Sequence, residues 1–378
     1  MRVPLSSPDI VKKDIEAVAG VMKTRFLSIG PKVVEFEKRM GSFVGRKYAV
    51  AVNSGTSALH LIIRSMGIGE GDVVITTPFS FIASSNCILF ERARPLFVDI
   101  EEETLNLDAD KVEEKLESLS NEELAKVKAL LVVDAFGQPA DLDRFIEIGK
   151  KYNLKLIEDS AEALGAEYKG KRAGSLGEVG VFAFYPNKQI TTGEGGLLVT
   201  DNEELARLAR SMRNQGRGES GEWLDHERLG YNFRMDELSA ALGCSQMERI
   251  EEILDKRAEV ARMYRGKLSE VEEVQVPYIA PYVSRMSWFV YVVRLERGID
   301  RNKVIKYLNK EGVQCKPYFT PIHLQPFYRK MFGYKEGDFP VTENVAERTI
   351  ALPFFNNLKE EQIDYVVEKL KEGIEISR

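Results

Sequence analysis

Short runs of apolar and β-branched residues recur between positions 48 and 200, and longer segments of mixed or amphipathic character separate most of them. Runs of this length, bounded by turn residues, are typical of buried β-strands. We expect seven strands, at Tyr48–Val52, Val73–Thr76, Pro95–Val98, Ala129–Val133, Leu154–Glu158, Val179–Phe184 and Gly196–Thr200. The first five alternate with helical stretches, which predicts βα units and a largely parallel sheet. The last two are too close together for a helix, so we expect a functional loop between them.

The pattern changes in the second part of the chain. Apolar residues recur at helical spacing from Asp236 to about Leu268, which predicts one long connecting helix. A strand pattern at Trp288–Leu295 and helical patterns at Arg301–Glu311 and Lys359–Glu372 follow. The sequence therefore predicts an α/β protein with a large domain over residues 1–250 and a smaller C-terminal α+β domain over residues 251–378.

Composition and charge exclude several functions. The 378 residues carry a formal net charge of −6, which gives no basic surface of the kind that binds nucleic acid. We therefore expect no nucleic acid partner. The three cysteines and three histidines show no spacing typical of a metal site. We see neither a signal-peptide pattern at the start nor an apolar run long enough to span a membrane, so we expect a cytoplasmic protein without a membrane partner.

Three segments carry candidate chemistry. The first, Asn53-Ser54-Gly55-Thr56, directly follows the predicted strand Tyr48–Val52 and opens an apolar helix. Ser54 can cap that helix, and the free amides of Gly55 and Thr56 at its positive end would suit a phosphate. It is not a P-loop, because no lysine follows the glycine at the required place. Taken alone, the segment is better explained as an ordinary helix cap.

The second segment places Asp159 at the end of the apolar strand Leu154–Glu158, at the edge where open α/β sheets bind ligands. A carboxylate there could keep a pyridine nitrogen protonated. The third segment places Lys188 between bulky apolar residues and the glycine-rich turn Gly193–Gly196, where partial desolvation would lower its pKa and favour Schiff-base chemistry. An isolated Asp159 would more often be a helix cap, and an isolated Lys188 an exposed loop residue.

The ordered set is more specific than any one segment. A phosphate anchor, a strand-end aspartate and then a lysine follow the order found in fold-type-I enzymes that use pyridoxal 5′-phosphate (PLP). The chain resembles the DegT-type sugar aminotransferase family over nearly its whole length, most closely the perosamine-synthase branch. The matching segments include Gly30-Pro31, Ser54-Gly55-Thr56, Pro78–Phe81, Phe136–Pro139, Asp159–Glu162, Lys188–Gly196, Gly230–Met235, Pro321–Pro326 and Leu352-Pro353.

This resemblance implies a fold-type-I transferase with a mostly parallel seven-stranded sheet, and it implies roles for single residues. Lys188 would hold the cofactor as a Schiff base and shuttle the proton. Asp159 would pair with the pyridine nitrogen, and Phe81 would stack on the ring. Gly55 and Thr56 would hold the cofactor's phosphate.

The resemblance also implies contacts at the rim of the site. Asn232 would reach the phosphate in the neighbouring subunit, which makes a homodimer part of the active site. Glu162 stands where many relatives have Gln or His beside the phenolic oxygen of the cofactor. Tyr318 and His323 match family positions near the sugar, although a surface loop would explain them as well. Ala183 stands where most relatives have a Ser that contacts the phosphate, a loss of about 1 kcal/mol.

The implied reaction is transamination in amino-sugar biosynthesis, with L-glutamate as donor and a nucleotide-linked ketosugar, a 4-keto-6-deoxyhexose, as acceptor. Three alternatives remain. A PLP-dependent sugar dehydratase would replace the lysine with His, and some such enzymes add a cysteine-bound cluster, which Lys188 and the scattered cysteines argue against. An enzyme of amino-acid metabolism often carries an arginine clamp for a carboxylate. A non-catalytic PLP-binding regulator of the same fold would not need Lys188.

Overall fold

A computed structural model describes residues 1–218 and 225–377. Within this part of the chain, seven strands form the central sheet in the order β1-β9-β8-β5-β4-β2-β3. Only β9 runs antiparallel to its neighbours, β1 and β8. Each predicted strand is confirmed to within two residues. The bounds are β1 (Tyr48–Val52), β2 (Val73–Thr76), β3 (Arg94–Phe97), β4 (Val127–Val133), β5 (Lys155–Asp159), β8 (Val179–Ala183) and β9 (Gly196–Thr200).

Helices cover both faces of this sheet because its strands are apolar on both sides. In β1, Val50 and Val52 face one apolar cluster, while Ala49 and Ala51 face another. The first face packs on α3 (Gly55–Ser65), α4 (Ala83–Phe90) and α8 (Glu203–Arg213). The opposite face packs on α2 (Pro31–Val44), α5 (Ala109–Glu117), α7 (Leu142–Tyr152) and α9 (Glu237–Met247), and α6 (Asn121–Lys126) precedes β4.

The C-terminal part forms a second core around an antiparallel sheet of order β10-β12-β13. Its elements are α10 (Ile250–Leu268), β10 (Val274–Gln275), β12 (Tyr291–Leu295), α11 (Arg301–Lys310), β13 (Thr349–Leu352) and α14 (Glu360–Ser377). The strand expected from Trp288 begins at Tyr291, because the residues before it are bonded to other segments. Smaller elements are β6 (Glu167–Tyr168), β7 (Lys171–Arg172), β11 (Val283–Arg285), α12 (Pro326–Phe332), α13 (Pro340–Arg348) and the 3₁₀ turns Ala135–Gly137 and Ile322–Leu324.

The expectation of one helix over 236–268 is wrong, because the chain breaks between α9 and α10. Arg249 caps α10 with non-helical backbone angles. Its Nη2 donates to the carbonyl of Asp9, as does the side-chain amide of Gln246. These contacts with the N-terminal segment turn the chain. Because Leu254 packs in the large-domain core and Tyr264 in the small-domain core, α10 joins the two, and the boundary at 250/251 stays a prediction.

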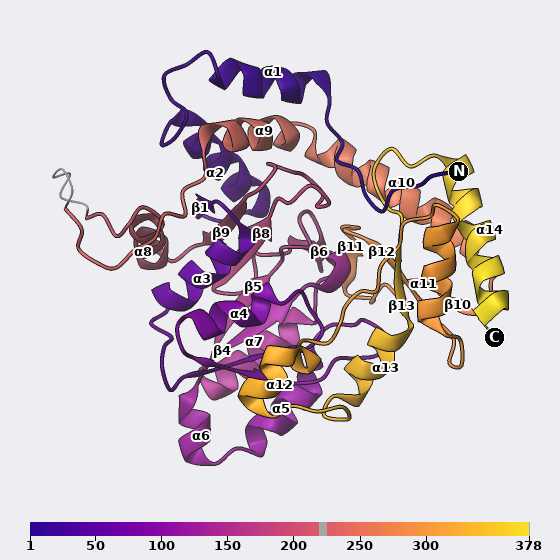
Figure 1. The fold of residues 1–378 in the computed structure, drawn as a ribbon. Helices are drawn as coiled ribbons and strands as arrows, with labels where there is room; N and C mark the ends of the chain where they lie inside the picture. Colours follow the sequence, from indigo (N-terminus) through magenta and orange to yellow (C-terminus); the bar gives the residue numbers. More distant parts are fainter. Residues whose placement is uncertain (219–224, 378) are drawn as a thin grey trace.

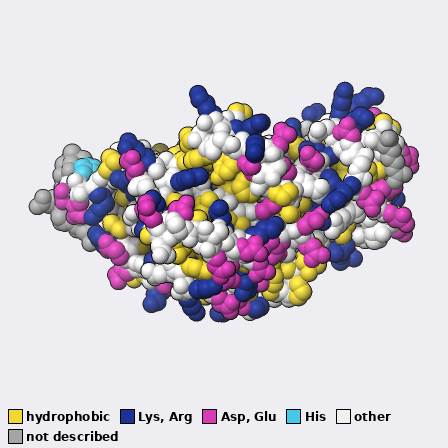
Figure 2. All heavy atoms as spheres, turned by 90° about the horizontal axis from the view of Figure 1, so that it is seen from below, with side chains coloured by type: hydrophobic (Ala, Val, Ile, Leu, Met, Phe, Trp, Pro, Cys, Tyr) yellow, Lys and Arg dark blue, Asp and Glu magenta, His cyan; other side chains and the backbone are white. Residues whose placement is uncertain are grey.

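The N-terminal segment joins both parts of the molecule (Figure 1). Val3 pairs with Val313 beside the small-domain core, whereas α1 (Lys12–Val21) lies against α9 of the large domain. On the face drawn in Figure 2, basic and acidic side chains are interspersed rather than gathered by sign. Among the described helices, none is both long and apolar enough to cross a membrane.

Candidate active site

The first candidate segment folds as the sequence predicts. Strand β1 ends at Val52, and Ser54 caps α3 by accepting a hydrogen bond from the amide of Ser57 at 3.1 Å. Gly55 and Thr56 are the first two residues of α3, where backbone amides have no acceptor within the helix. A Cβ on Gly55 would lie 2.7 Å from the Cβ of Ala183, so only glycine allows this approach. The positive end of α3 is therefore open to an anion.

Asp159 ends β5 and is almost fully buried. Its Oδ2 accepts a hydrogen bond from Ser84 Oγ at 2.7 Å, and its Oδ1 accepts one from the amide of Ala161 at 3.2 Å. Burial raises the pKa of Asp159, while the two hydrogen bonds and the charge of Lys188 oppose that rise. A buried carboxylate of this kind is well suited to form an ion pair with a protonated ring nitrogen.

Lys188 follows β8 in the loop before β9, and its amine lies among aromatic and acidic groups. Nζ is 3.6 Å from Glu162 Oε1 and 3.8 Å from the ring centroid of Phe289. Burial lowers the pKa of Lys188 against the opposing charges of Glu162 and Asp159, which is the direction expected from the sequence. Glu162 also accepts a hydrogen bond from the amide of Phe136 at 2.9 Å, and burial raises its pKa.

These groups line one cavity of about 530 Å³, in the range of small-molecule sites. It collects Gly55 and Thr56 of α3, the predicted residues Phe81, Asp159, Glu162, Lys188 and Tyr318, and further side chains that include Ser84, Ala183, Tyr185, Asn187, Glu194 and Phe289. Phe81 is 61% exposed, so its ring is free to meet a ligand.

Two predicted residues lie outside this cavity. Asn232 is exposed, and its backbone forms an isolated β-bridge with Asn214. Within a single chain it does not line the cavity. His323 is fully buried and hydrogen-bonds Glu343 Oε1 at 3.0 Å instead of lining the cavity. The surface-loop alternative for His323 is wrong, because its side chain is part of the interior, and its place near the sugar stays a prediction.

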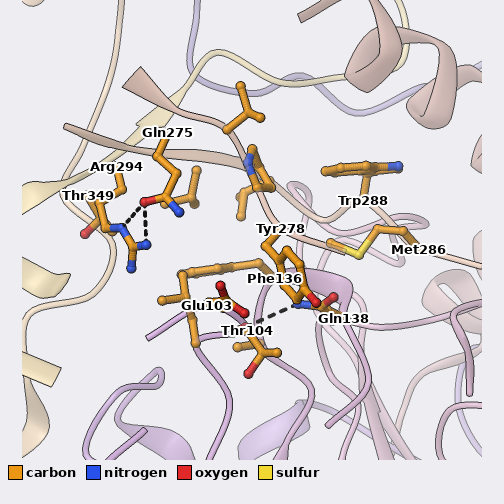
Figure 3. A pocket seen from close by; sticks show the side chains of 16 residues that line it. Glu103, Thr104, Phe136, Gln138, Gln275, Tyr278, Met286, Trp288, Arg294 and Thr349 are labelled. Carbon is orange, nitrogen blue, oxygen red and sulfur yellow. Dashed lines mark hydrogen bonds between the residues drawn. The ribbon is translucent and has the colours of Figure 1, made fainter. Parts of the chain in front are cut away.

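Figure 3 shows a second, narrower cavity. It offers only about 40 Å³. Phe136 and Trp288 form part of its wall, and Arg294 is bonded to Gln275 at its edge. It lacks the pairing of a carboxylate and a buried amine found in the wide cavity, so the wide cavity is the candidate active site.

The residues of the wide cavity fit PLP. The α3 amides suit its phosphate, Asp159 suits its pyridine nitrogen, and Lys188 offers an amine of lowered pKa. Asn187 also lines this cavity, and its Oδ1 is buried without a hydrogen-bond partner among the described residues, so the site holds an unpaired acceptor. Fold and site together define a fold-type-I enzyme of the PLP-dependent class.

The comparisons with known proteins agree with this class. Residues 8–371 match the model of the DegT/DnrJ/EryC1/StrS aminotransferase family, so the chain belongs to that family. It is 37% identical to GDP-perosamine synthase of Caulobacter vibrioides, over 98% of this chain and 97% of that protein. It is 36% identical to the spore coat polysaccharide biosynthesis protein SpsC of Bacillus subtilis, over 98% and 96%.

The fold has close structural counterparts as well. PseC of Helicobacter pylori, an aminotransferase involved in the biosynthesis of pseudoaminic acid, superposes with a TM-score of 0.92 at 28% identity, over 100% of both chains. The fold class and the enzyme class predicted from the sequence, a PLP-dependent aminotransferase with a mostly parallel seven-stranded sheet, are thereby confirmed.

Sequence reasoning missed two residues of the site. Ser84 bonds Asp159, and it lies four residues after Ser80, whose hydroxyl is 2.9 Å away. The four-residue spacing of Ser80, within the Pro78–Phe81 segment, and Ser84, just after it, was a usable signal. Phe289 under Lys188 had no such signal, because it lies 101 positions farther along the chain and only the packing of the small domain brings it there.

Proposed function

We propose that this enzyme transfers an amino group from L-glutamate to the C4 carbonyl of a nucleotide-linked 4-keto-6-deoxyhexose. The observation that carries the proposal is the single cavity in which Lys188 and Asp159 face the open end of α3. Similarity to GDP-perosamine synthase supports the sugar class. PLP, when bound, supplies an electron sink for the proton transfer at the amino-bearing carbon.

The chain's own residues hold and orient the reactants. Lys188 provides the amine that takes and returns a proton, because burial lowers its pKa and so favours the uncharged amine. Asp159 holds a proton on the pyridine nitrogen, and Ser84 fixes the orientation of that carboxylate. Glu162 lies beside Lys188 and orients the phenolic oxygen of the cofactor.

Further residues bind the two ends of the reactants. Gly55 and Thr56 bind the phosphate through backbone amides, to which Thr56 adds its hydroxyl. Phe81 covers the cofactor ring, and Tyr318 contacts the sugar from the small-domain side of the cavity. His323 acts on the sugar only indirectly, since it lies outside the cavity wall and is held by Glu343.

A homodimer completes the site in this proposal. Asn232 is exposed and free to enter the cavity of a second copy. Large apolar side chains gather in the exposed surface of the N-terminal segment, as expected of an interface; they are Ile10, Ile15, Met22, Phe26, Leu27, Ile29 and Val34. Co-expression of Lys188→Ala and Asn232→Ala chains tests this. Partial recovery of activity supports a shared site, and no recovery contradicts it.

The first test of the reaction is the absorbance of the purified protein with PLP. We expect a visible band that falls after L-glutamate is added, while a near-ultraviolet pyridoxamine phosphate band rises. Lys188→Ala should lose the visible band, and Lys169→Ala, which removes an exposed lysine paired with Asp143, should keep it. A wild-type protein without the band would contradict the role of Lys188.

The acceptor is tested next with nucleotide sugars that carry the keto group at C4 or at C3. Amination only of the 3-keto sugars would contradict the C4 assignment. Loss of water from the sugar instead of amine transfer would favour a sugar dehydratase. A visible band that ignores both glutamate and sugars would favour a non-catalytic regulator or a different amino donor.

A further inference from the structure

The segment Ser287–Phe289, which leads into β12, is the wall between the two cavities. Trp288 lines the narrow cavity (Figure 3), and Phe289 lines the wide one. Two neighbouring residues of this segment thus face different cavities. Both side chains are buried, and the face of the Phe289 ring meets Lys188 Nζ at 3.8 Å from its centroid. The position of this wall therefore sets how closely the lysine is covered.

Arg257 of α10 holds the wall from behind. Its Nε donates to the carbonyl of Trp288 at 2.5 Å, and its Nη2 donates to the carbonyl of Phe289 at 2.7 Å. Nη1 donates to Asn356 Oδ1 at 2.8 Å. One planar guanidinium thus binds two consecutive main-chain carbonyls, a geometry that no other cationic side chain offers.

The charge of Arg257 is an unusual feature of the interior. The side chain is 3% exposed, and none of the ion pairs among the described residues includes it. Burial lowers its pKa to about 9, so it still carries its charge at neutral pH. Asp9, which accepts a hydrogen bond from Asn356, raises the pKa of Arg257 by its charge but does not form an ion pair with it. A buried cation without a direct ion pair is costly, and an apolar residue of similar volume is often the more stable choice. Stability alone therefore gives a weak reason for an arginine here.

The other end of the wall is tied to the lysine loop. The amide of Ser287 donates to the carbonyl of Gly137 at 3.1 Å, and its hydroxyl accepts a hydrogen bond from Gln189 Nε2 at 2.9 Å. Gln189 directly follows Lys188 in the chain. With Ser287 fixed in this way, and the amide of Phe289 bonded to the carbonyl of Phe136 at 3.4 Å, Arg257 holds the carbonyls of the next two residues.

We propose that Arg257 is a positioning residue for the amine of Lys188: by binding the carbonyls of Trp288 and Phe289, it holds the phenyl ring against Nζ and keeps water away. The inference rests on the proposed function, because it treats Lys188 as the reactive amine. It goes beyond that function by assigning the protection of this amine to a residue that touches neither reactant.

The charged groups around Lys188 fix the sign of the expected effect. Glu162 and Asp159 face it from the β5 side and raise its pKa, while burial and the charge of Arg257 lower it, burial being the largest cause. Loss of Arg257 removes a cation and lets water past the ring. Both changes raise the pKa of Lys188.

The test measures that pKa without relying on turnover. The full chain is loaded with pyridoxamine phosphate, which leaves the Lys188 amine free, and is labelled with acetic anhydride over a range of pH. Mass spectrometry of the Lys188 peptide gives the midpoint, and the measurement is repeated without cofactor. Arg257→Met and Arg257→Lys are compared with Arg294→Met, a control that removes another buried arginine, one bonded to Gln275 rather than to the wall.

We expect the midpoint to rise by about one pH unit in Arg257→Met. Arg257→Lys keeps the charge but loses the planar guanidinium, and its labelling midpoint should rise by at least half as much. Arg294→Met should match the wild type. An unchanged midpoint in Arg257→Met, or a wild-type midpoint in Arg257→Lys, overturns the proposal, and so does an equal rise in Arg294→Met.

The test also distinguishes an unfolded variant and a failure of the proposed function from a failure of this inference. If circular dichroism shows that Arg257→Met does not fold, the comparison of Arg257→Lys with Arg294→Met decides. Failure of the proposed function appears elsewhere, as a missing visible band when PLP is added to the wild type. Failure of this inference appears only in the labelling midpoints.

Discussion

Ala183 allows the phosphate end of the site to be tested by adding an interaction rather than removing one. It is the last residue of β8 and lines the wide cavity. Its Cβ lies where it would crowd any side chain on Gly55, the first residue of α3. A hydroxyl at this position would therefore stand beside the amides that we assign to the phosphate. We predict that Ala183→Ser binds the cofactor more tightly.

The magnitude follows from the charge of the acceptor. A hydrogen bond to a charged group contributes about 1.5–3 kcal/mol, and fixing the hydroxyl rotamer takes part of that away. About 1.4 kcal/mol should remain, which corresponds to a tenfold lower dissociation constant. The assay is equilibrium dialysis with pyridoxamine phosphate, because this form makes no covalent bond to Lys188 and so isolates the phosphate contact.

Ala183→Cys is the matched control, since its thiol has nearly the shape of the serine side chain but is a weak donor. We expect its affinity to stay near that of the wild type. An unchanged affinity in Ala183→Ser, with an unchanged melting temperature of the free protein, would refute the placement of the phosphate at α3. Equal tightening by serine and cysteine would show that packing, not hydrogen bonding, is responsible.

Three other predictions concern stability and chemistry. Gly137→Ala should lower the free energy of unfolding, measured with urea, by about 4 kcal/mol or more, because its Cβ would lie 1.7 Å from the carbonyl oxygen of Ser287. The control Gly170→Ala has open space around it and should lower this free energy by only about 1–2 kcal/mol, because of its positive φ. Burial lowers the pKa of His323, so protonation favours the unfolded chain; the free energy of unfolding should fall from about pH 7.5 to about pH 5.5, and less steeply in His323→Gln. Asp159→Asn should slow the glutamate half-reaction, followed by stopped-flow absorbance, by about 100-fold or more; a rate near that of the wild type would contradict its role.

The sheet was predictable because its signal is local. Each strand is a short apolar run bounded by turn residues, and the structure moves its ends by two residues at most. The break between α9 and α10 was not predictable, because the sequence around Arg249 is helical in character. The turn depends on Asp9, which lies 240 positions away along the chain.

The candidate site likewise contains residues that could be predicted from local pattern and residues that could not. Asp159 ends β5, and Gly55 and Lys188 lie within a few residues after the ends of β1 and β8, so parallel strand ends bring them to one edge of the sheet. Their assembly could therefore be expected from order alone. Phe289 arrives from the small domain, and His323 turns away from the cavity toward Glu343. Such contacts depend on how two cores pack, which no local pattern specifies.

The pairing of the N-terminal segment has a consequence for how the chain is made. The amide of Leu5 is bonded to the side chain of Gln314, 309 positions later, and Val3 pairs with Val313. Val3 and Leu5 must therefore wait, unpaired, until Val313 and Gln314 have been synthesised. The large-domain sheet is complete well before that, at Thr200. Closure of the N-terminal segment is thus a late folding event, which adds Val3 to the small-domain core.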